Sequence, residues 1–244
     1  MKLTFALIFI LLLTNLSPII FPQSKKSMDI GVIAGTNYSS VFADIPSSPT
    51  DEELNPEDFY KYRFGYFGGV TFNYTFNNYF GVSGDLIYNL KGYNFDNEND
   101  QKVYVKLHYL ELPLLMNYYF LQNKNLVSNL FLGPYISYLI EGRYEAETRF
   151  GSYDGKIEEF NDFDFGITAG ISFLFPIQTN KIGIDLRYDW GLSNIYNSDF
   201  FGFEEYDLSF NNSSFMLGVK FLFNIKTKSS FEDQETEEED DVWR

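Results

Sequence analysis

Apolar residues alternate without a break with charged, polar or glycine residues along residues 181–193. Asp185, Arg187 and Asp189 occupy every second position there, and apolar residues fill the positions between them. Successive side chains of a β-strand point to opposite faces, so this pattern predicts a strand with one charged face and one apolar face. Two carboxylates beside a guanidinium can serve as an acid–base pair in a cleft, or can form an ion-pair ladder inside a narrow barrel. The sequence implies no cleft, so we favour the ladder.

The only histidine, His108, raises the possibility of an outer-membrane lipid hydrolase, since some of these enzymes are eight-stranded barrels. Such an enzyme needs Ser, His and an acid in contact, and the sequence around His108 offers no such set. The chain has no Cys, so it has neither a disulfide framework nor a thiol nucleophile. We therefore assign no catalytic residue, no cofactor site and no metal site.

The charge of the chain is strongly acidic. Its formal net charge of −16 over 244 residues argues against nucleic acid as a partner, because phosphates are bound by Lys and Arg. Eight of the acids lie between Glu232 and Asp241. We expect residues 224–244 to be a disordered, solvated tail on the periplasmic side. A docking site there for a basic periplasmic or envelope protein is the alternative.

The first residues predict export. Lys2 is followed by an apolar run from Leu3 to Leu13, which is the length expected of a secretory signal and is short for a membrane span. We expect residues 1–24 to be a cleaved signal peptide, with a retained anchor as the alternative.

Seven further segments share the period of two found in 181–193. They cover residues 29–41, 63–76, 79–95, 102–120, 126–143, 162–175 and 213–223. The connections between the eight segments alternate between long polar loops and tight turns. The predicted loops are 42–62, 96–101, 144–161 and 194–212. This arrangement is typical of outer-membrane barrels. The sequence therefore predicts an all-β fold, a single eight-stranded antiparallel up-and-down transmembrane β-barrel over residues 28–223.

The segment 102–120 is less regular than the others. Its apolar residues are odd-numbered from Val103 to Tyr109 and even-numbered from Leu110 to Phe120. Either a bulge near Tyr109 shifts the phase of the strand, or the first half of the strand stands above the bilayer with two mixed faces.

The two faces of the predicted strands differ too much for an ordinary soluble core. One face is rich in Ile, Leu, Phe and Tyr, and we expect it to touch lipid. The other carries charges of both signs, which would be costly to bury unless they pair with one another. We expect them to form a network in the barrel lumen that comprises Asp85, Lys91, Glu141, Arg143, Asp164, Asp185, Arg187, Asp189 and Lys220.

Aromatic residues cluster at the ends of the apolar face that lie next to the tight turns. Such residues form girdles at membrane–water interfaces. The predicted periplasmic girdle consists of Tyr74, Phe76, Phe80, Tyr118, Phe120, Phe173, Phe175, Phe221 and Phe223.

Four stretches carry a resemblance to a known family. They are GVIAGTNYS (31–39), YLELPLLMNYYF (109–120), FLGPYISYLI (131–140) and FMLGVKFLF (215–223). With these, the region 28–223 resembles the Bacteroidetes outer-membrane β-barrel domains that include the PorT-like proteins. The resemblance implies an outer-membrane location and no particular activity, although the PorT-like branch is associated with secretion and gliding machinery. The chain departs from this pattern by continuing for 21 residues beyond Phe223.

These observations predict a non-enzymatic outer-membrane protein that contacts lipid and has a structural, adhesive or envelope-complex accessory role, with a link to secretion as one option. The alternative is a soluble periplasmic or secreted barrel that holds an apolar ligand, as lipocalins do. That barrel would need its apolar face inside. A solute pore is disfavoured, because eight strands leave little open lumen.

Overall fold

The computed structural model describes residues 26–44, 60–97, 101–148, 151–157, 159–196 and 209–225. These residues form nine strands. They are β1 (Ser27–Asp44), β2 (Tyr60–Thr75), β3 (Phe80–Asn97), β4 (Gln101–Gln122), β5 (Val127–Thr148), β6 (Gly151–Lys156), β7 (Phe163–Ile177), β8 (Asn180–Gly191) and β9 (Ser209–Ile225).

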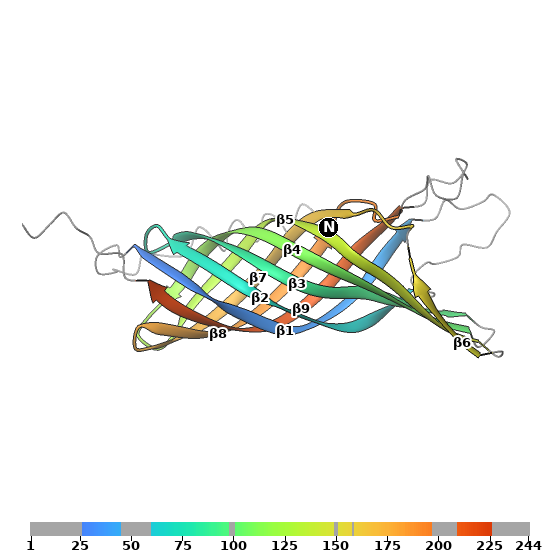
Figure 1. The fold of residues 1–244 in the computed structure, drawn as a ribbon. Helices are drawn as coiled ribbons and strands as arrows, with labels where there is room; N and C mark the ends of the chain where they lie inside the picture. Colours follow the sequence, from blue (N-terminus) through green and yellow to red (C-terminus); the bar gives the residue numbers. More distant parts are fainter. Residues whose placement is uncertain are drawn as a thin grey trace, which may run out of the picture.

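Eight of the strands close into a ring (Figure 1). Each strand pairs antiparallel with its neighbours in the order β1, β2, β3, β4, β5, β7, β8, β9, and β9 pairs with β1 over seventeen residue pairs from Met28↔Ile225 to Asp44↔Ser209. The predicted eight-stranded, antiparallel, up-and-down barrel is confirmed. The remaining strand, β6, pairs only with β5 among the described strands and lies outside the ring.

One end of the barrel, here called the turn end, carries the tight connections 76–79, 123–126 and 178–179. Asn side chains shape two of them. The Asn77 Oδ1 atom accepts hydrogen bonds from the backbone N–H groups of Tyr79 and Phe80, and Asn123 Oδ1 accepts from those of Asn125 and Leu126. An Asn side chain that bonds its own backbone two residues on replaces part of a turn, which is why these short Asn-rich connections suffice.

The opposite end, here called the loop end, contains more strand than the sequence predicts. The segment 144–161 is predicted to be a loop, which is wrong for residues 144–148 and 151–156. β5 instead continues to Thr148 and pairs with β6 from Arg143↔Lys156 to Thr148↔Gly151. Gly151 has a φ of 136°, a conformation that L side chains rarely adopt, so a glycine suits the start of this returning strand. The expected loops 42–62, 96–101 and 194–212 also begin or end as strand, in β1 to β4 and β9.

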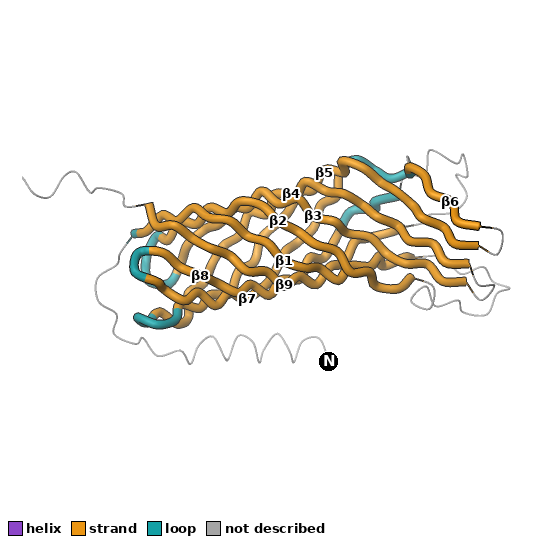
Figure 2. The backbone as a smooth tube through the Cα atoms, turned by 60° about the horizontal axis from the view of Figure 1, so that its bottom comes forward, coloured by secondary structure: helices purple, strands orange, loops and turns teal. Residues whose placement is uncertain are grey.

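The strands do not all reach the same height at the loop end. β5 stops pairing with β7 at Tyr138↔Phe163 but continues with β4 as far as Lys102↔Glu147. A sheet of β3, β4, β5 and β6 therefore extends past the closed part of the barrel, with β6 at its edge (Figure 2). This sheet is called the loop-end sheet below.

Two predicted segments fall mainly outside the described residues. The signal peptide, 1–24, lies wholly outside them. Of the predicted tail, 224–244, Asn224 and Ile225 belong to β9, and the part from residue 226 onward lies outside the described residues. None of the described segments forms a helix of the length and apolar character that a membrane crossing requires.

Candidate functional site

The orientation of β8 decides what lies inside the barrel. Ile184 and Leu186 expose 43% and 46% of their surface, whereas Asp185 and Arg187 between them expose 0% and 4%. The apolar face therefore points outward and the charged face points inward. The alternative of a soluble barrel with an apolar chamber is wrong for the middle of this molecule, because the side chains that fill it are charged.

Arg187 holds the part of the interior nearer the turn end. Its guanidinium lies 2.7 Å from an Asp85 oxygen on β3 and 2.9 Å from an Asp185 oxygen on β8. Lys220 on β9 binds the same Asp185 carboxylate at 2.6 Å, and the Ser172 hydroxyl on β7 donates to it at 2.6 Å. The Asp185 carboxylate and its partner Arg187 thereby join four strands, β3, β7, β8 and β9, across the lumen.

An aromatic ring supports the guanidinium from the inner wall. The Arg187 side chain lies over the Phe131 ring at 5.4 Å from its centroid, and a buried cation over a ring gains electrostatic attraction from it. Phe131 in turn fits because residue 170 is glycine, since a Cβ atom there would come within 2.4 Å of the Phe131 ring. The small residue on β7 thus makes space for the large one on β5.

Lys91 holds the part of the interior nearer the loop end. Its ammonium lies 2.6 Å from Glu111 on β4 and 3.3 Å from Asp189 on β8. It also stands 4.6 Å from the centre of the Tyr135 ring. The Thr168 hydroxyl donates to the remaining oxygen of Asp189 at 2.8 Å. The cation is therefore enclosed by two carboxylates and an aromatic face.

Asp164 is bound differently, since its hydrogen-bond donors are neutral. Tyr135 and Asn212 donate to its Oδ2 atom at 3.3 and 2.9 Å, and Ser193 donates to Oδ1 at 2.9 Å. Asn212 also donates to the Tyr109 hydroxyl at 3.3 Å. Asp164 therefore joins the charged middle of the barrel to the residues above it.

Seven of the nine predicted lumen charges lie in this interior, and two do not. The side chains of Glu141 and Arg143 are 32% and 48% exposed and lie 4.0 Å apart. Their predicted place in the lumen is wrong because of a bulge in β5. His108 of β4 pairs with Glu141, and Tyr109 pairs with Leu139, so that Ile140 is an extra residue. An extra residue reverses the phase of the strand beyond it, which turns Glu141 and Arg143 outward.

One interior residue was missed by the sequence analysis. Glu111 is 1% exposed and is the nearer of the two carboxylates at Lys91. A signal for it was present, because Glu111 stands between Leu110 and Leu112, and an acid between two outward leucines must point inward. With Glu111 included, the set Asp85, Lys91, Glu111, Asp164, Asp185, Arg187, Asp189 and Lys220 is called the interior network below.

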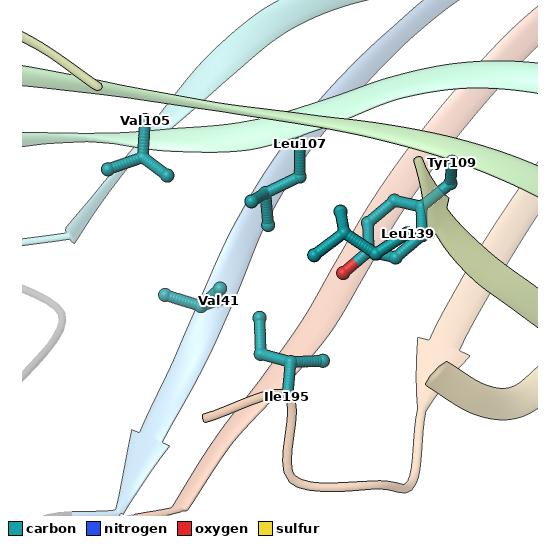
Figure 3. Close-up of a cluster of buried hydrophobic side chains, with 6 residues drawn as sticks. All are labelled: Val41, Val105, Leu107, Tyr109, Leu139 and Ile195. Atoms are coloured by element: carbon teal, nitrogen blue, oxygen red, sulfur yellow. The ribbon is translucent and has the colours of Figure 1, made fainter. Parts of the chain in front are cut away.

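Above the interior network, the same inward face becomes apolar. A buried cluster fills this region (Figure 3), called the loop-end core, and it consists of Val41, Val105, Leu107, Tyr109, Leu139 and Ile195. Ile195 comes from the segment after β8, which enters through backbone bonds such as Ile195 N to Phe210 O at 2.8 Å. Together the two sets of side chains fill the described part of the barrel from its middle to its loop end.

The loop-end core settles the ambiguity of segment 102–120. Odd-numbered residues of β4 face inward along the whole strand, from buried Val105 through Glu111 to Tyr119. The phase of β4 does not change, and the extra residue lies in β5 instead. The band of outward-facing apolar side chains around the middle of the barrel is called the apolar belt below. Of the two readings of this segment, the structure therefore supports the one in which the first half of the strand stands above this belt.

Comparison with known protein families gives one match. A family model described as "Outer membrane protein beta-barrel domain" matches residues 21–197. This chain belongs to that family. Membership places the protein in the outer membrane, with its outward apolar face in lipid.

Solved structures give further matches, at low identity. Ail, the attachment invasion locus protein of Yersinia pestis, is 17% identical, with 80% of this chain and 98% of that chain covered and a TM-score of 0.39. The outer membrane protein OprG of Pseudomonas aeruginosa is 14% identical, with 83% and 99% covered and a TM-score of 0.48. The outer membrane protease OmpT of Escherichia coli is 10% identical, with 84% and 99% covered and a TM-score of 0.42. Comparison with curated proteins gave no match.

The predicted girdle residues lie on the outward face of this barrel, near its turn end. Several of them touch one another across or along strands. Tyr74 and Phe76 have ring centroids 5.2 Å apart, and those of Phe80 and Tyr118 are 5.5 Å apart. The predicted set also includes Phe120, Phe173, Phe175, Phe221 and Phe223, each of which is half-buried or exposed. Their role as an interface girdle stays a prediction.

The interior network is arranged to hold strands together. Asp85, Glu111, Asp185 and Asp189 each have a cationic partner within 3.3 Å and are at most 2% exposed. A carboxylate so enclosed has no access to a substrate. In the described part of the chain, no group of three His, Cys, Asp or Glu side chains could hold a metal ion.

Proposed function

We propose that this outer-membrane protein is a non-enzymatic scaffold that presents the loop-end sheet outside the cell for adhesion to a protein partner. The loop end is taken as extracellular because outer-membrane barrels keep their tight turns on the periplasmic side. The supporting observation is that β6 forms the edge of a sheet extending beyond the closed barrel. A strand edge offers unpaired N–H and C=O groups to which a partner's strand can add.

The side chains of β6 suit contact with a protein. Tyr153 is 55% exposed. Asp154 and Lys156 bring opposite charges, and they bind Arg143 and Glu141 on β5 at 3.7 and 3.6 Å. Tyrosine and arginine are enriched in protein interfaces. An adhesive role therefore accounts for both the length of β5 and the strand that returns along it.

The absence of enzymatic activity is part of the proposal. Its support is that the interior carboxylates are paired and enclosed. The hydrolase option also loses its main candidate, because His108 bonds the Tyr88 hydroxyl at 2.5 Å and, among the described residues, has no hydrogen bond to a serine.

Adhesion is tested by shortening the β5–β6 hairpin. Replacing residues 145–154 by Asn-Gly retains the Tyr144↔Gly155 pair and supplies a residue pair that favours a tight hairpin turn. Bacteria that display the full-length protein are expected to adhere to a host-cell layer, and bacteria with the shortened hairpin are not. Lys124→Glu, in a connection of the turn end, is the control and should leave adhesion unchanged. Equal adhesion by the shortened variant would contradict the proposal.

Three finer assignments belong to the same proposal. Residues 1–24 are proposed to be a cleaved signal peptide, and the chain is proposed to be a Bacteroidetes-type, PorT-like member of its family. The acidic residues from 226 onward are proposed to bind a basic periplasmic or envelope protein, with a secretion component as one option. Co-purification from cross-linked cells, with and without residues 226–244, tests this last part. Recovery of the same partners by both forms would contradict it.

A further inference from the structure

β1 and β2 separate from each other at the loop end. Their pairing ends at Ser39↔Arg63. Beyond that point β1 continues alongside β9 as far as Asp44, and β2 pairs only with β3, through residues 60–62. The two strands thus lean toward different neighbours, and a cleft opens in the wall of the barrel between them.

The cleft is large enough for a small molecule, with a volume of about 510 Å³. Four of its nine lining residues are aromatic. Tyr38 and Tyr62 stack with ring centroids 4.8 Å apart, and Phe42 is exposed beside them. On the inner side the cleft reaches Val41 and Tyr60, which belong to the loop-end core or pack against it. An apolar surface therefore runs from the outside of the barrel to its interior.

Four polar residues complete the lining of the cleft. The Nδ2 atom of Asn94 donates to the Tyr62 carbonyl oxygen at 3.4 Å, while its Oδ1 atom is buried and has no hydrogen-bond partner among the described residues. Lys61 adds a positive charge to the lining of the cleft. The Ser40 hydroxyl donates to the Tyr60 carbonyl oxygen at 3.5 Å, and the Ser213 hydroxyl bonds that of Tyr188 at 3.0 Å. A concave site that combines aromatic side chains with placed polar groups can bind a small ligand.

We propose that this cleft binds a small amphiphile with an apolar body and an acidic group. The body lies against Tyr38, Phe42 and Tyr62, and the acidic group lies beside Lys61. A donor group on the ligand satisfies the Oδ1 atom of Asn94. The chemistry is shared by free amphiphiles and by membrane lipids at the outer surface, so the experiment separates the two sources.

The probe is 8-anilinonaphthalene-1-sulfonate, which combines aromatic rings, an N–H donor and a sulfonate. It is titrated into the purified full-length protein in phosphatidylcholine nanodiscs, with empty nanodiscs subtracted. One saturable site per protein is expected. Ser40→Phe, which fills the cleft, should weaken binding at least about tenfold, and Tyr62→Ala, which removes one wall, about threefold to tenfold.

Phe163→Ala is the matched control, because Phe163 is an exposed aromatic residue at the loop end of β7, three strands around the ring from β1. It should bind the probe as the wild type does. Migration of the unheated protein on a gel verifies that each variant is folded. If Ser40→Phe does not fold, the probe affinities of Tyr62→Ala and Phe163→Ala still show whether the probe binds in the cleft.

Native mass spectrometry of the same samples addresses a lipid occupant. A lipid that the wild type retains and Tyr62→Ala and Ser40→Phe lose would support the proposal with a lipid as the source, even without probe binding. Two results would overturn the proposal. One is equal probe binding by the wild type and the folded cleft variants, and the other is neither saturable probe binding nor a retained lipid. The adhesion assay is independent of both results.

Discussion

The middle of this barrel and its loop end are built from the same strands with opposite polarity. Along β4, Glu111 points inward while Leu110 and Leu112 point outward. A few residues earlier in the same strand, Leu107 points inward and Lys106 points outward. The backbone alternation is unchanged between the two regions. What differs is the surroundings, because lipid favours apolar residues on the outside and water favours charged ones there.

The comparison shows where the apolar belt ends. On β4 the polarity changes between His108 and Leu110, and on β5 the bulge at Ile140 lies at the same level. The bulge allows β5 to change phase at the boundary, whereas β4 changes only its residue types. Two neighbouring strands thus meet the same boundary by different means.

The largest expected effect is the loss of the central cation. Arg187→Met keeps much of the side-chain volume. Among the described residues it leaves Asp85 with no cationic partner and Asp185 with Lys220 alone. Breaking a buried ion pair in this way costs about 3–5 kcal/mol. Urea unfolding in lipid vesicles, followed by tryptophan fluorescence, measures it. Arg143→Met at the loop end, where the arginine is half-exposed, should cost at most about 1 kcal/mol. Equal costs would show that the two regions do not differ as described.

The next effect concerns the loop-end core. Leu107 is fully buried there, so Leu107→Ala should destabilise the protein by about 2–5 kcal/mol through lost packing and a cavity. The same unfolding experiment measures it. If Leu107→Ala lowers the unfolding free energy no more than an alanine substitution at an exposed position does, the loop end is not packed as a core.

A charge placed on the lipid-facing side should cost slightly less. Leu114 is 58% exposed to the surroundings of the belt, and Leu114→Arg is expected to cost about 2–4 kcal/mol. Tyr104→Arg, at an outward position of the same strand above the belt, should stay within about 0.5 kcal/mol. Similar costs at the two positions would place the lipid boundary elsewhere.

The smallest effect is expected for the outward ion pair between Lys106 and Glu145. The Lys106 ammonium holds the pKa of the Glu145 carboxyl below its usual range. Stability from this pair is therefore present above the ordinary carboxyl pKa and is lost as the pH falls through the lowered value. Lys106→Met should change the unfolding free energy little at pH 7, and the difference should shrink as the pH falls through the lowered pKa of Glu145 and in high salt. A difference that grows toward acid pH would contradict the direction of the shift.

The ring of eight strands, the inward face of each strand in the belt and most of the interior network could be predicted from the sequence. The reason is that apolar and polar residues alternate with a period of two wherever one face of a strand meets lipid. Besides Glu111, three features escaped prediction. Glu141 and Arg143 were misplaced because a single extra residue, Ile140, carries no distinctive signature. β6 was missed because its pairing with β5 depends on register rather than on apolar alternation. Ile195 enters the loop-end core from a connection, where packing in three dimensions selects the inward residue.

The inversion of polarity along β4 can be measured directly. The chain has no cysteine, so single substitutions Tyr104→Cys, Lys106→Cys, Leu112→Cys and Leu114→Cys can each carry one spin label in a lipid bilayer. Labels at 112 and 114 are expected to be relaxed mainly by oxygen, which concentrates in lipid, and labels at 104 and 106 mainly by a water-soluble nickel complex. Preferential relaxation by nickel at 112 and 114 would contradict the central claim that lipid surrounds the apolar face of this barrel.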